Sequence, residues 1–299
     1  MEVAMRPILI LGATGNIAAP VARELAAKDD VRLRLTSRSE AGRDKLRAEF
    51  PGAEIMSADW LDKTSLDRAF DGIHGALMVT PDFTDEVTAV ANVLAAAKGS
   101  PVFEHLVRLI AIPPIAKEDM TEEWLRTNAG VAMHWMAMEA FRGTDIPITF
   151  VNVPTWTDFH LVTAGAQSVR ERRELPMKGD AARLWISEDD MGEVFAKILR
   201  EGPKQHVGRT YVLTGPMRHR FGEIAEMISD EIGEKVTWVE SDESFKLALG
   251  EHAEALTTYA RYSSKHAEKQ QHTKTLEELL GRAPTTLREY IARYRASFI

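Results

Sequence analysis

The stretch Ile8-Leu9-Ile10-Leu11-Gly12-Ala13-Thr14-Gly15-Asn16-Ile17-Ala18 decides the fold of this chain. Its first four residues form a continuous apolar run, which is typical of a strand buried on both faces. Gly12 permits a tight turn out of that strand, Gly15 lets the backbone approach a pyrophosphate, and Ala18 lets the following helix pack closely on the sheet. The unpaired N–H groups at the start of the helix favour a phosphate. The spacing predicts a dinucleotide-binding turn, the alternative being a glycine-rich turn without a ligand.

The residues after this turn alternate between short apolar runs and helical patterns, which is typical of stacked βαβ units. We therefore expect an α/β fold with a Rossmann-type doubly wound parallel sheet and a dinucleotide-binding core over residues 1–155. Its predicted strands lie at 31–36, 54–57, 75–80, 106–112 and 148–153, and its predicted helices at 16–28, 85–98 and 121–142.

The alternation of strand and helix patterns is less regular after Pro154. We expect residues 156–299 to form mostly a small C-terminal α/β substrate-binding annex, with some segments returning to the core. The pattern predicts a helix over 187–200, a strand over 210–213 and a last helix that begins at a capping box, Thr286-Leu287-Arg288-Glu289. The polar stretch 262–274 lacks apolar periodicity and predicts a surface excursion.

Composition limits the possible functions. The net charge is -8, which leaves no basic face for a nucleic-acid backbone. There is no cysteine, which excludes disulfides and thiolate chemistry and fits a cytoplasmic protein. The longest apolar runs have the length of strands, so we expect no membrane span, and the histidines show no metal-binding spacing. We expect a small-molecule substrate, no nucleic acid, no metal, and a monomer or homodimer.

The end of the second predicted strand selects the dinucleotide. An NAD site favours an acid at this point for the ribose 2′-hydroxyl. The chain has Thr36-Ser37-Arg38-Ser39 instead, and Arg38 can pair with a 2′-phosphate to which the serines donate. We therefore predict NADP(H) in preference to NAD(H). The alternative is a solvated arginine, and the nearby Glu40 is the acid that favours NAD(H).

Further residues fit the same ligand. Thr14, Asn16 and Ile17 complete the phosphate loop. Asp59 follows the third predicted strand and is placed to accept from the adenine amino group, although a helix cap or a turn residue would look the same in the sequence. Thr80-Pro81 follows the fourth strand and is expected to border the dinucleotide at the switch point of the sheet.

Taken together, these segments resemble the NmrA-like group of atypical short-chain dehydrogenases/reductases. The resemblance continues through Glu139, Pro154-Thr155-Trp156, Asp190 and the segments 208–216 and 280–284. It implies a Rossmann core with a small C-terminal substrate domain that binds NAD(P)(H). Members of this group include quinone, triphenylmethane-dye and isoflavone-type reductases, as well as proteins that bind the dinucleotide only to regulate partners.

The chain departs from the dehydrogenase pattern where that pattern carries its proton-transfer residues. A typical short-chain dehydrogenase has Tyr-x-x-x-Lys and a Ser or Thr hydroxyl on the fifth strand. Counted back from Glu139, the lysine position is Trp135 and the tyrosine position is Val131, and the strand hydroxyl is replaced within Leu109-Ile110-Ala111. The arginine that often precedes the family's proline is Val153.

Other side chains are candidates for chemistry. His134 stands beside the vacated lysine position and could donate a proton, or it could be a histidine satisfied inside a helical interface. Lys117 could reach the nicotinamide ribose or a substrate carbonyl, or be a solvated loop residue. Asp158 and His160 could orient a substrate. Glu139 is expected to be a structural acid that pairs with backbone or with a nearby cation.

A planar or apolar ligand would suit the aromatic residues expected around the substrate, Trp135, Trp156 and Phe159. Hydride transfer to an acceptor that stabilises charge needs no protein acid. We therefore predict an NADPH-dependent oxidoreductase that reduces an electron-poor aromatic, quinone, enone or imine. The alternatives are an NADP(H)-sensing regulatory protein and a non-redox isomerase or cyclase on the same fold.

Overall fold

The computed structural model describes residues 5–113, 120–126, 131–240 and 264–299. The chain divides into two compact units. The first comprises residues 1–110, 132–152 and 191–211, and the second comprises residues 111–131, 153–190 and 212–299.

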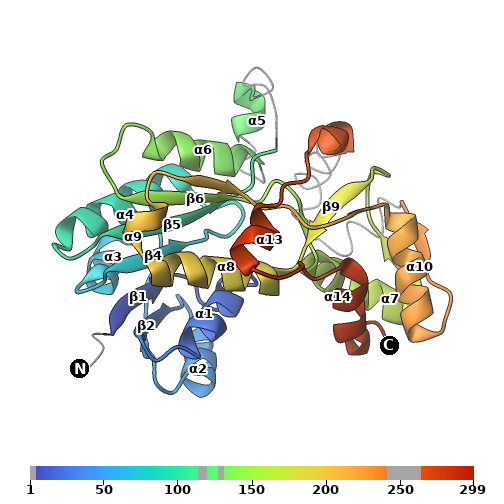
Figure 1. The fold of residues 1–299 in the computed structure, drawn as a ribbon, viewed down its shortest axis with the longest axis horizontal. Helices are drawn as coiled ribbons and strands as arrows, with labels where there is room; N and C mark the ends of the chain where they lie inside the picture. Colours follow the sequence, from blue (N-terminus) through green and yellow to red (C-terminus); the bar gives the residue numbers. More distant parts are fainter. Residues whose placement is uncertain (1–4, 114–119, 127–130, 241–263) are drawn as a thin grey trace. The chain divides into compact units, whose positions relative to one another are not determined.

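A seven-stranded sheet forms the centre of the first unit, in the order β10-β6-β5-β4-β1-β2-β3 (Figure 1). Strands β1 to β6 pair in parallel wherever they are neighbours. This order reverses direction after β1, as in a Rossmann sheet, and it confirms the predicted fold class. The strands are β1 (Arg6–Ile10), β2 (Val31–Thr36), β3 (Glu54–Met56), β4 (Gly75–Met78), β5 (His105–Ile110), β6 (Ile148–Asn152) and β10 (Thr210–Val212).

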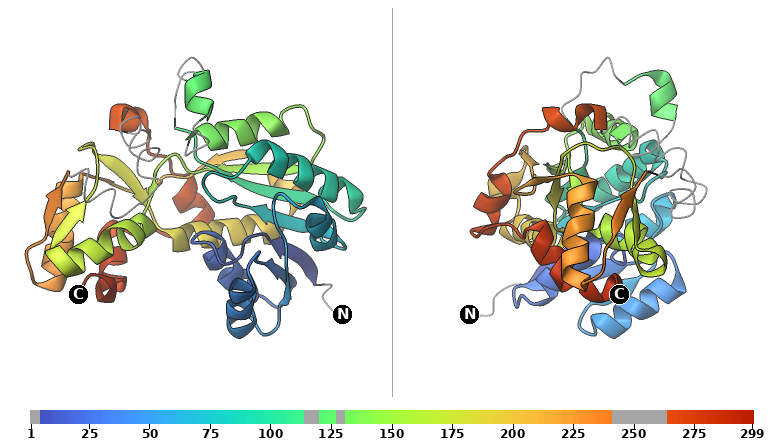
Figure 2. Two further views of the ribbon diagram at one scale, coloured as in Figure 1. Left: turned by 180° about the vertical axis from the view of Figure 1, so that it is seen from behind. Right: turned by 90° about the vertical axis from the view of Figure 1, so that its right-hand side faces the viewer.

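Helices cover both faces of this sheet (Figures 1 and 2). On one face, Leu9, Ala76 and Leu106 of the strands share a buried apolar cluster with α3 (Lys63–Phe70), α4 (Glu86–Gly99) and α6 (Val131–Phe141). The other face carries α1 (Ala18–Ala26), α2 (Glu40–Glu49) and α8 (Glu188–Glu201), and a short helix α9 (Pro203–His206) precedes β10. Because both faces are buried, the strands are apolar along most of their length, and the sequence pattern found them for that reason.

The second unit contains two small sheets, one in the order β11-β9-β7 and one that pairs β12 with β8. Its core is rich in aromatic side chains, with Trp185 and Phe221 at its centre. The strands are β7 (Trp156–Thr157), β8 (Glu174–Pro176), β9 (Arg183–Ile186), β11 (Arg218–His219) and β12 (Thr237–Val239). The helices are α5 (Glu122–Arg126), η2 (Leu161–Gly165), α7 (Ala166–Arg172), α10 (Phe221–Ile232), η4 (Ala267–Lys269), α13 (Thr275–Leu280), α14 (Leu287–Arg293) and η5 (Arg295–Ser297).

Two sequence predictions of local structure are confirmed in detail. Glu289 accepts from the Thr286 N–H at 2.8 Å, and the Thr286 hydroxyl accepts from the Glu289 N–H at 3.3 Å, so α14 begins with the expected capping box. The helix predicted over 187–200 is α8. Where one helix was predicted over 121–142, the structure has α5 and α6, and residues 127–130 lie outside the described part of the chain.

The prediction of a surface excursion over 262–274 holds only in part for its described residues, because exposed residues such as Lys265 and Glu268 alternate with buried ones. Ala267 and Gln270 are buried. Arg218 donates to the Ala267 carbonyl at 2.8 Å, and the Thr273 N–H donates to Thr214 Oγ1 at 2.9 Å. Because the partly buried Arg218 and the buried Arg183, which donates to Ser264, require hydrogen-bond acceptors, polar groups of this segment are drawn into the second unit.

Within the described residues, no helix is long and apolar enough to cross a membrane.

Candidate nucleotide-binding site

The loop between β1 and α1 has the shape that its glycines predict. Gly12 has a φ of +63°, a left-handed conformation that is costly for residues with a side chain. The Gly15 N–H donates to the Gly12 carbonyl at 2.9 Å, which closes the turn. Thr14, Gly15 and Asn16 are exposed at its tip, whereas Ala18 is buried against the core. The tip of the turn, residues 14–16, is therefore exposed, while the helix that follows packs on the core.

Helix α1 begins without a side-chain cap and without an acid in its first turn. Across the described residues, no acceptor receives the N–H groups of Asn16 and Ile17. These amides and the positive end of the helix dipole form the kind of environment in which proteins hold phosphates.

The end of β2 supports this loop from below. The buried Thr36 accepts from the Gly12 N–H through its hydroxyl at 3.2 Å and from the Ala13 N–H through its carbonyl at 2.9 Å. Ser37 follows and is also buried, and its N–H donates to the Met56 carbonyl of β3 at 3.3 Å. The loop and the end of β2 are therefore fixed to one another.

Arg38 and Asp59, which the sequence assigned to the same ligand from different strands, lie close together. Arg38 Nη1 is 3.9 Å from Asp59 Oδ2, and the Arg38 side chain is 81% exposed. Asp59 Oδ1 accepts from the Leu61 N–H at 3.0 Å, so Asp59 is also a turn residue, whereas Asp62 caps α3. The second Asp59 oxygen remains directed toward the Arg38 side.

Thr80 and Pro81 follow β4 as predicted, with Pro81 exposed and Thr80 buried. The Thr80 hydroxyl is occupied within the fold, because it accepts from Arg108 Nη2 at 2.9 Å and donates to Glu86. Arg108 Nη2 also donates to Glu86 Oε1 at 2.9 Å, and both charged side chains are fully buried. This ion pair connects β4, β5 and the start of α4 directly beneath Thr80.

His134 lies on α6 and is buried. Burial, and then the charge of nearby Arg108, lower the pKa of its imidazole to about 3. The ring is therefore neutral at neutral pH. Trp135, the next residue of α6, is partly exposed, and Glu139 pairs with Arg142 at 2.6 Å, as expected for a structural acid. Lys117 lies outside the described residues.

The remaining candidates belong to the second unit. Trp156 packs against Trp185 and Phe221 with ring centroids 5.7 Å apart in both pairs, and Phe159 stacks on His160 at 4.3 Å. His160 Nδ1 lies 2.9 Å from both the hydroxyl and the carbonyl oxygen of Thr157, which fixes its ring. Trp156, Phe159 and His160 are each partly exposed.

Asp158 is almost fully buried in the second unit. Burial raises the pKa of its carboxyl well above the usual range, and Glu188 and Asp190 raise it further. A carboxyl in this setting holds its proton more tightly than an exposed aspartic acid does. The described residues contain no group of histidines and acids arranged to hold a metal ion.

Sequence reasoning missed several residues around the nucleotide site. Arg43 of α2 donates to the carbonyls of Ser37 and Arg38, at 3.0 and 2.8 Å. The Trp60 ring lies beside Gly12, 3.8 Å from where a Cβ on that residue would be. The available signals were an arginine five residues after Arg38 and an aromatic residue directly after Asp59.

The chain is similar to curated reductases over nearly its whole length. A (4-alkanoyl-5-oxo-2,5-dihydrofuran-3-yl)methyl phosphate reductase of Streptomyces griseus is 28% identical over 97% of this chain and 99% of its own. An NAD(P)H azoreductase of Xenophilus azovorans is 26% identical over 78% of this chain and 76% of its own. These relatives support the expectation of an NAD(P)H-dependent oxidoreductase.

Solved structures share the fold. A Citrobacter sp. triphenylmethane reductase complexed with NADP(H) superposes with a TM-score of 0.77, at 23% identity over 97% of this chain and 99% of that one. NmrA, a negative transcriptional regulator solved in complex with NAD, gives a TM-score of 0.72 at 18% identity, over 98% of this chain and 96% of that one. Both dinucleotides therefore occur on this fold.

The sheet order and the phosphate loop define a Rossmann-type nucleotide-binding protein. The sequence model of the NmrA-like family matches residues 5–107, which include the phosphate loop, Arg38, Asp59 and Thr80-Pro81. The predicted resemblance to the NmrA-like family is confirmed.

Proposed function

We propose that this protein is an NADPH-dependent oxidoreductase that transfers hydride to an electron-poor aromatic, quinone, enone or imine. The observation that carries the proposal is the approach of Arg38 to Asp59, at 3.9 Å, beside a phosphate loop whose tip is exposed. An exposed guanidinium at this point suits the 2′-phosphate of NADP(H), because it can form two parallel hydrogen bonds to phosphate oxygens.

The residues of the first unit fit the proposed cofactor. Around the pyrophosphate we place the loop residues Gly12, Thr14, Gly15, Asn16 and Ile17. We place Ser37 and Arg38 at the 2′-phosphate, Asp59 at the adenine amino group, and Thr80-Pro81 at the border of the ligand. The bound dinucleotide supplies the hydride, while the protein binds, orients and excludes water.

The substrate class follows from what the chain lacks. None of its five tyrosines is followed four residues later by a lysine, so the usual proton-donating pair is absent from the sequence. His134, neutral with a pKa of about 3, is a poor source of a proton at neutral pH. An acceptor that stabilises the incoming charge needs no such donor. This favours conjugated acceptors over simple ketones.

The names of the relatives are consistent with this class. They specify an oxo-dihydrofuran phosphate, an azo compound and a triphenylmethane compound, all of which carry conjugated systems. For this chain we assign substrate contact to the aromatic residues Trp135, Trp156 and Phe159, and an orienting role to His160. Lys117 is assigned to the nicotinamide ribose or a substrate carbonyl, and His134 stays a candidate as a neutral group.

Loss of NADPH absorbance against a panel of quinones, cationic dyes, enones, azo compounds and imines tests the proposal, with a simple aliphatic ketone as the control acceptor. We expect turnover with at least one conjugated acceptor and none with the ketone. Tight NADPH binding without turnover of any acceptor would favour a dinucleotide sensor instead. Product formation without net NADPH consumption would favour an isomerase or cyclase.

The candidate side chains are tested in the same assay. His160→Ala should lower turnover at saturating substrate, with Thr163→Ala, an exposed neighbour, as the matched control. His134→Ala should leave the pH dependence of turnover unchanged near neutrality, because the imidazole does not titrate there. A new pH dependence in that variant would show that His134 does exchange a proton during turnover.

A further inference from the structure

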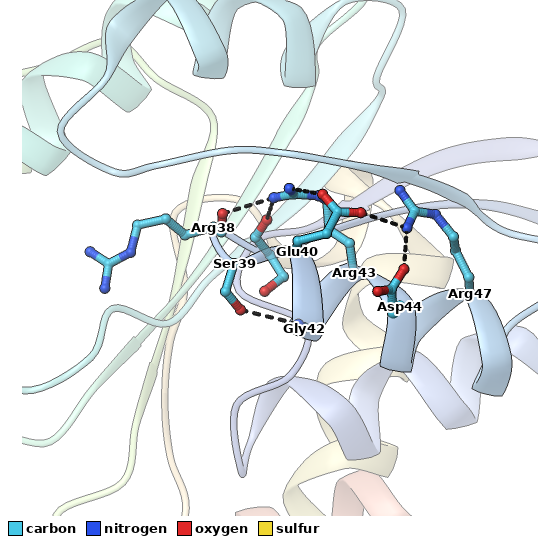
Figure 3. Close-up of polar contacts among 8 residues, drawn as sticks. Arg38, Ser39, Glu40, Gly42, Arg43, Asp44 and Arg47 are labelled. Carbon is cyan, nitrogen blue, oxygen red and sulfur yellow. Dashed lines mark hydrogen bonds and ion pairs between the residues drawn. The ribbon is translucent and has the colours of Figure 1, made fainter.

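Arg43 of α2 lies against the backbone that carries Arg38 (Figure 3). Its Nη1 donates to the Ser37 carbonyl at 3.0 Å and to the Arg38 carbonyl at 2.8 Å. Its Nη2 pairs with the Glu40 carboxylate, and the side chain is only 15% exposed. A single guanidinium therefore fixes two successive peptide units at the end of β2.

This contact determines where two amides point. In a trans peptide the carbonyl and the N–H of the next residue point in opposite directions, and the described chain has no cis peptide. Because the carbonyls of Ser37 and Arg38 face Arg43, the N–H groups of Arg38 and Ser39 face away from it. Neither N–H has an acceptor within the described residues. Figure 3 shows the Arg38 side chain also directed away from Arg43.

The same cluster occupies Glu40, the acid closest to the end of β2. Its carboxylate accepts from Arg47 Nη1 at 2.9 Å as well as from Arg43. Hydrogen bonds from Arg47 and Arg43 lower the pKa of Glu40. In an NAD site, an acid near this point binds the ribose hydroxyls. Here both oxygens of the acid are engaged by arginines.

Gly42 allows α2 to approach this closely. A Cβ on Gly42 would lie 2.1 Å from Ser37 Oγ and 2.9 Å from Ser39 Oγ, well inside contact distance. Instead the Gly42 N–H donates to Ser39 Oγ at 3.1 Å. The start of the helix, and with it Arg43, is thereby fixed relative to residues 37–39.

We propose that Arg43 is a positioning residue for dinucleotide selection: through the carbonyls of Ser37 and Arg38 it directs the Arg38 side chain and the adjacent amides toward the 2′-phosphate of NADP(H). The inference rests on the proposed function, which places that phosphate at Arg38. It adds that recognition depends on the geometry of the Arg43 fork and not only on its charge.

Calorimetric titration of the full-length protein with NADPH and with NADH tests this role. Arg43→Met should weaken NADPH binding by about tenfold or more, the size expected when charge-assisted hydrogen bonds are lost, and should change NADH binding by less than about threefold. Arg43→Lys keeps the charge but not the planar fork, and it should also lose at least about fivefold in NADPH affinity. Arg23→Met on α1, which removes an exposed pair with Glu49 at the end of α2, is the matched control.

Each other result overturns the inference. Equal losses for NADPH and NADH, or no loss in Arg43→Met, remove the selective role. Full NADPH affinity in Arg43→Lys would show that charge alone matters. Thermal melting without ligand verifies folding, and if Arg43→Met does not fold, Arg43→Lys decides.

Arg38→Met separates this inference from the proposed function. If Arg38→Met loses NADPH affinity and Arg43→Met does not, only the positioning role fails. If the unmodified protein does not prefer NADPH and Arg38→Met binds it unchanged, the proposed cofactor preference fails and the positioning role falls with it.

Discussion

The Arg38 guanidinium lies 3.9 Å from the Asp59 carboxylate, and Arg38 is the more exposed of the two side chains. An exposed pair at this distance contributes about 0–1 kcal/mol to stability. The contact therefore does little for folding and leaves Arg38 free to turn toward a ligand. We expect Arg38 to bind the 2′-phosphate of the dinucleotide and Asp59 to bind its adenine.

Asp59→Asn should weaken NADPH and NADH binding to a similar extent, by about three- to tenfold. The single acceptor oxygen of asparagine can keep the bond to the Leu61 N–H, which leaves a donor amide facing the adenine amino group. Isothermal titration with both dinucleotides measures the effect. Asp67→Asn, an exposed acid on α3, is the matched control. A loss confined to NADPH would place Asp59 at the 2′-phosphate instead.

The elements that the sequence predicted well are those whose signal is local. The strands of the first unit are apolar because both faces of the sheet are buried, and the phosphate loop is recognisable because small residues are needed at fixed positions. The assignment of Arg38 and Asp59 to the candidate site rests on their positions directly after β2 and β3, which the sequence shows. Their mutual approach then follows from the strand order.

Interactions that depend on how the folded elements pack against one another were not predictable. Arg43 has the sequence appearance of a solvent-facing charge on a helix, and its role depends on how α2 lies against residues 37–39. Arg108 interrupts an apolar strand, and nothing local shows that Glu86, 22 residues away, is its partner. The polar segment 262–274 was misjudged in part for the same reason, since the arginines that bind it come from other parts of the second unit.

Arg108→Met should destabilise the first unit strongly, by about 3–5 kcal/mol, because it leaves Glu86 buried without its cation. The double variant Arg108→Met/Glu86→Leu should recover most of that loss, since it removes both buried charges. Urea unfolding measures both. Arg200→Met, which breaks an exposed pair with Asp30, is the control and should cost no more than about 1 kcal/mol. A double variant as unstable as the single one would argue against an electrostatic origin.

Acidification should destabilise the first unit through His105 and His134. Burial lowers the pKa of His105 to about 4 and that of His134 to about 3, both below the ordinary value of 6.5. As the pH falls below 6.5, these histidines bind protons in the unfolded chain but not in the folded chain. The free energy of unfolding therefore falls. Each histidine should cost about 2 kcal/mol between pH 7 and pH 5.

The slope of unfolding free energy against pH measures this effect independently of any fixed loss of stability. His134→Leu should reduce the slope between pH 7 and pH 5 by the amount that corresponds to the uptake of about one proton on unfolding. His272→Gln, at an exposed position, should leave the slope unchanged. An unaltered slope in His134→Leu would mean that His134 titrates normally in the folded protein.

Asp158→Asn should stabilise the second unit at pH 8. Asp158 depends on pH in the opposite sense to the two histidines, because its contribution to stability is lost as the pH rises. Burial, and then Glu188 and Asp190, raise the pKa of Asp158, so its folded form binds a proton more tightly than its unfolded form. Its contribution to stability is fully present below the unfolded pKa and is lost as pH rises through the folded pKa. Asparagine has nearly the shape of the neutral acid without that loss, which predicts a gain on the order of 1 kcal/mol.

Chemical denaturation of Asp158→Asn at pH 8 and pH 5 checks this expectation, because the gain should shrink as the solution becomes more acidic. Asp180→Asn is the matched control, since Asp180 is exposed and pairs with Arg220 at 3.3 Å, and its replacement should have little effect at either pH. Turnover measured on the same samples separates stability from chemistry. A variant that is more stable but slower would make the protonated Asp158 carboxyl a hydrogen-bond donor to the substrate, whereas a variant that is less stable at pH 8 would mean that this carboxyl is ionised in the folded protein.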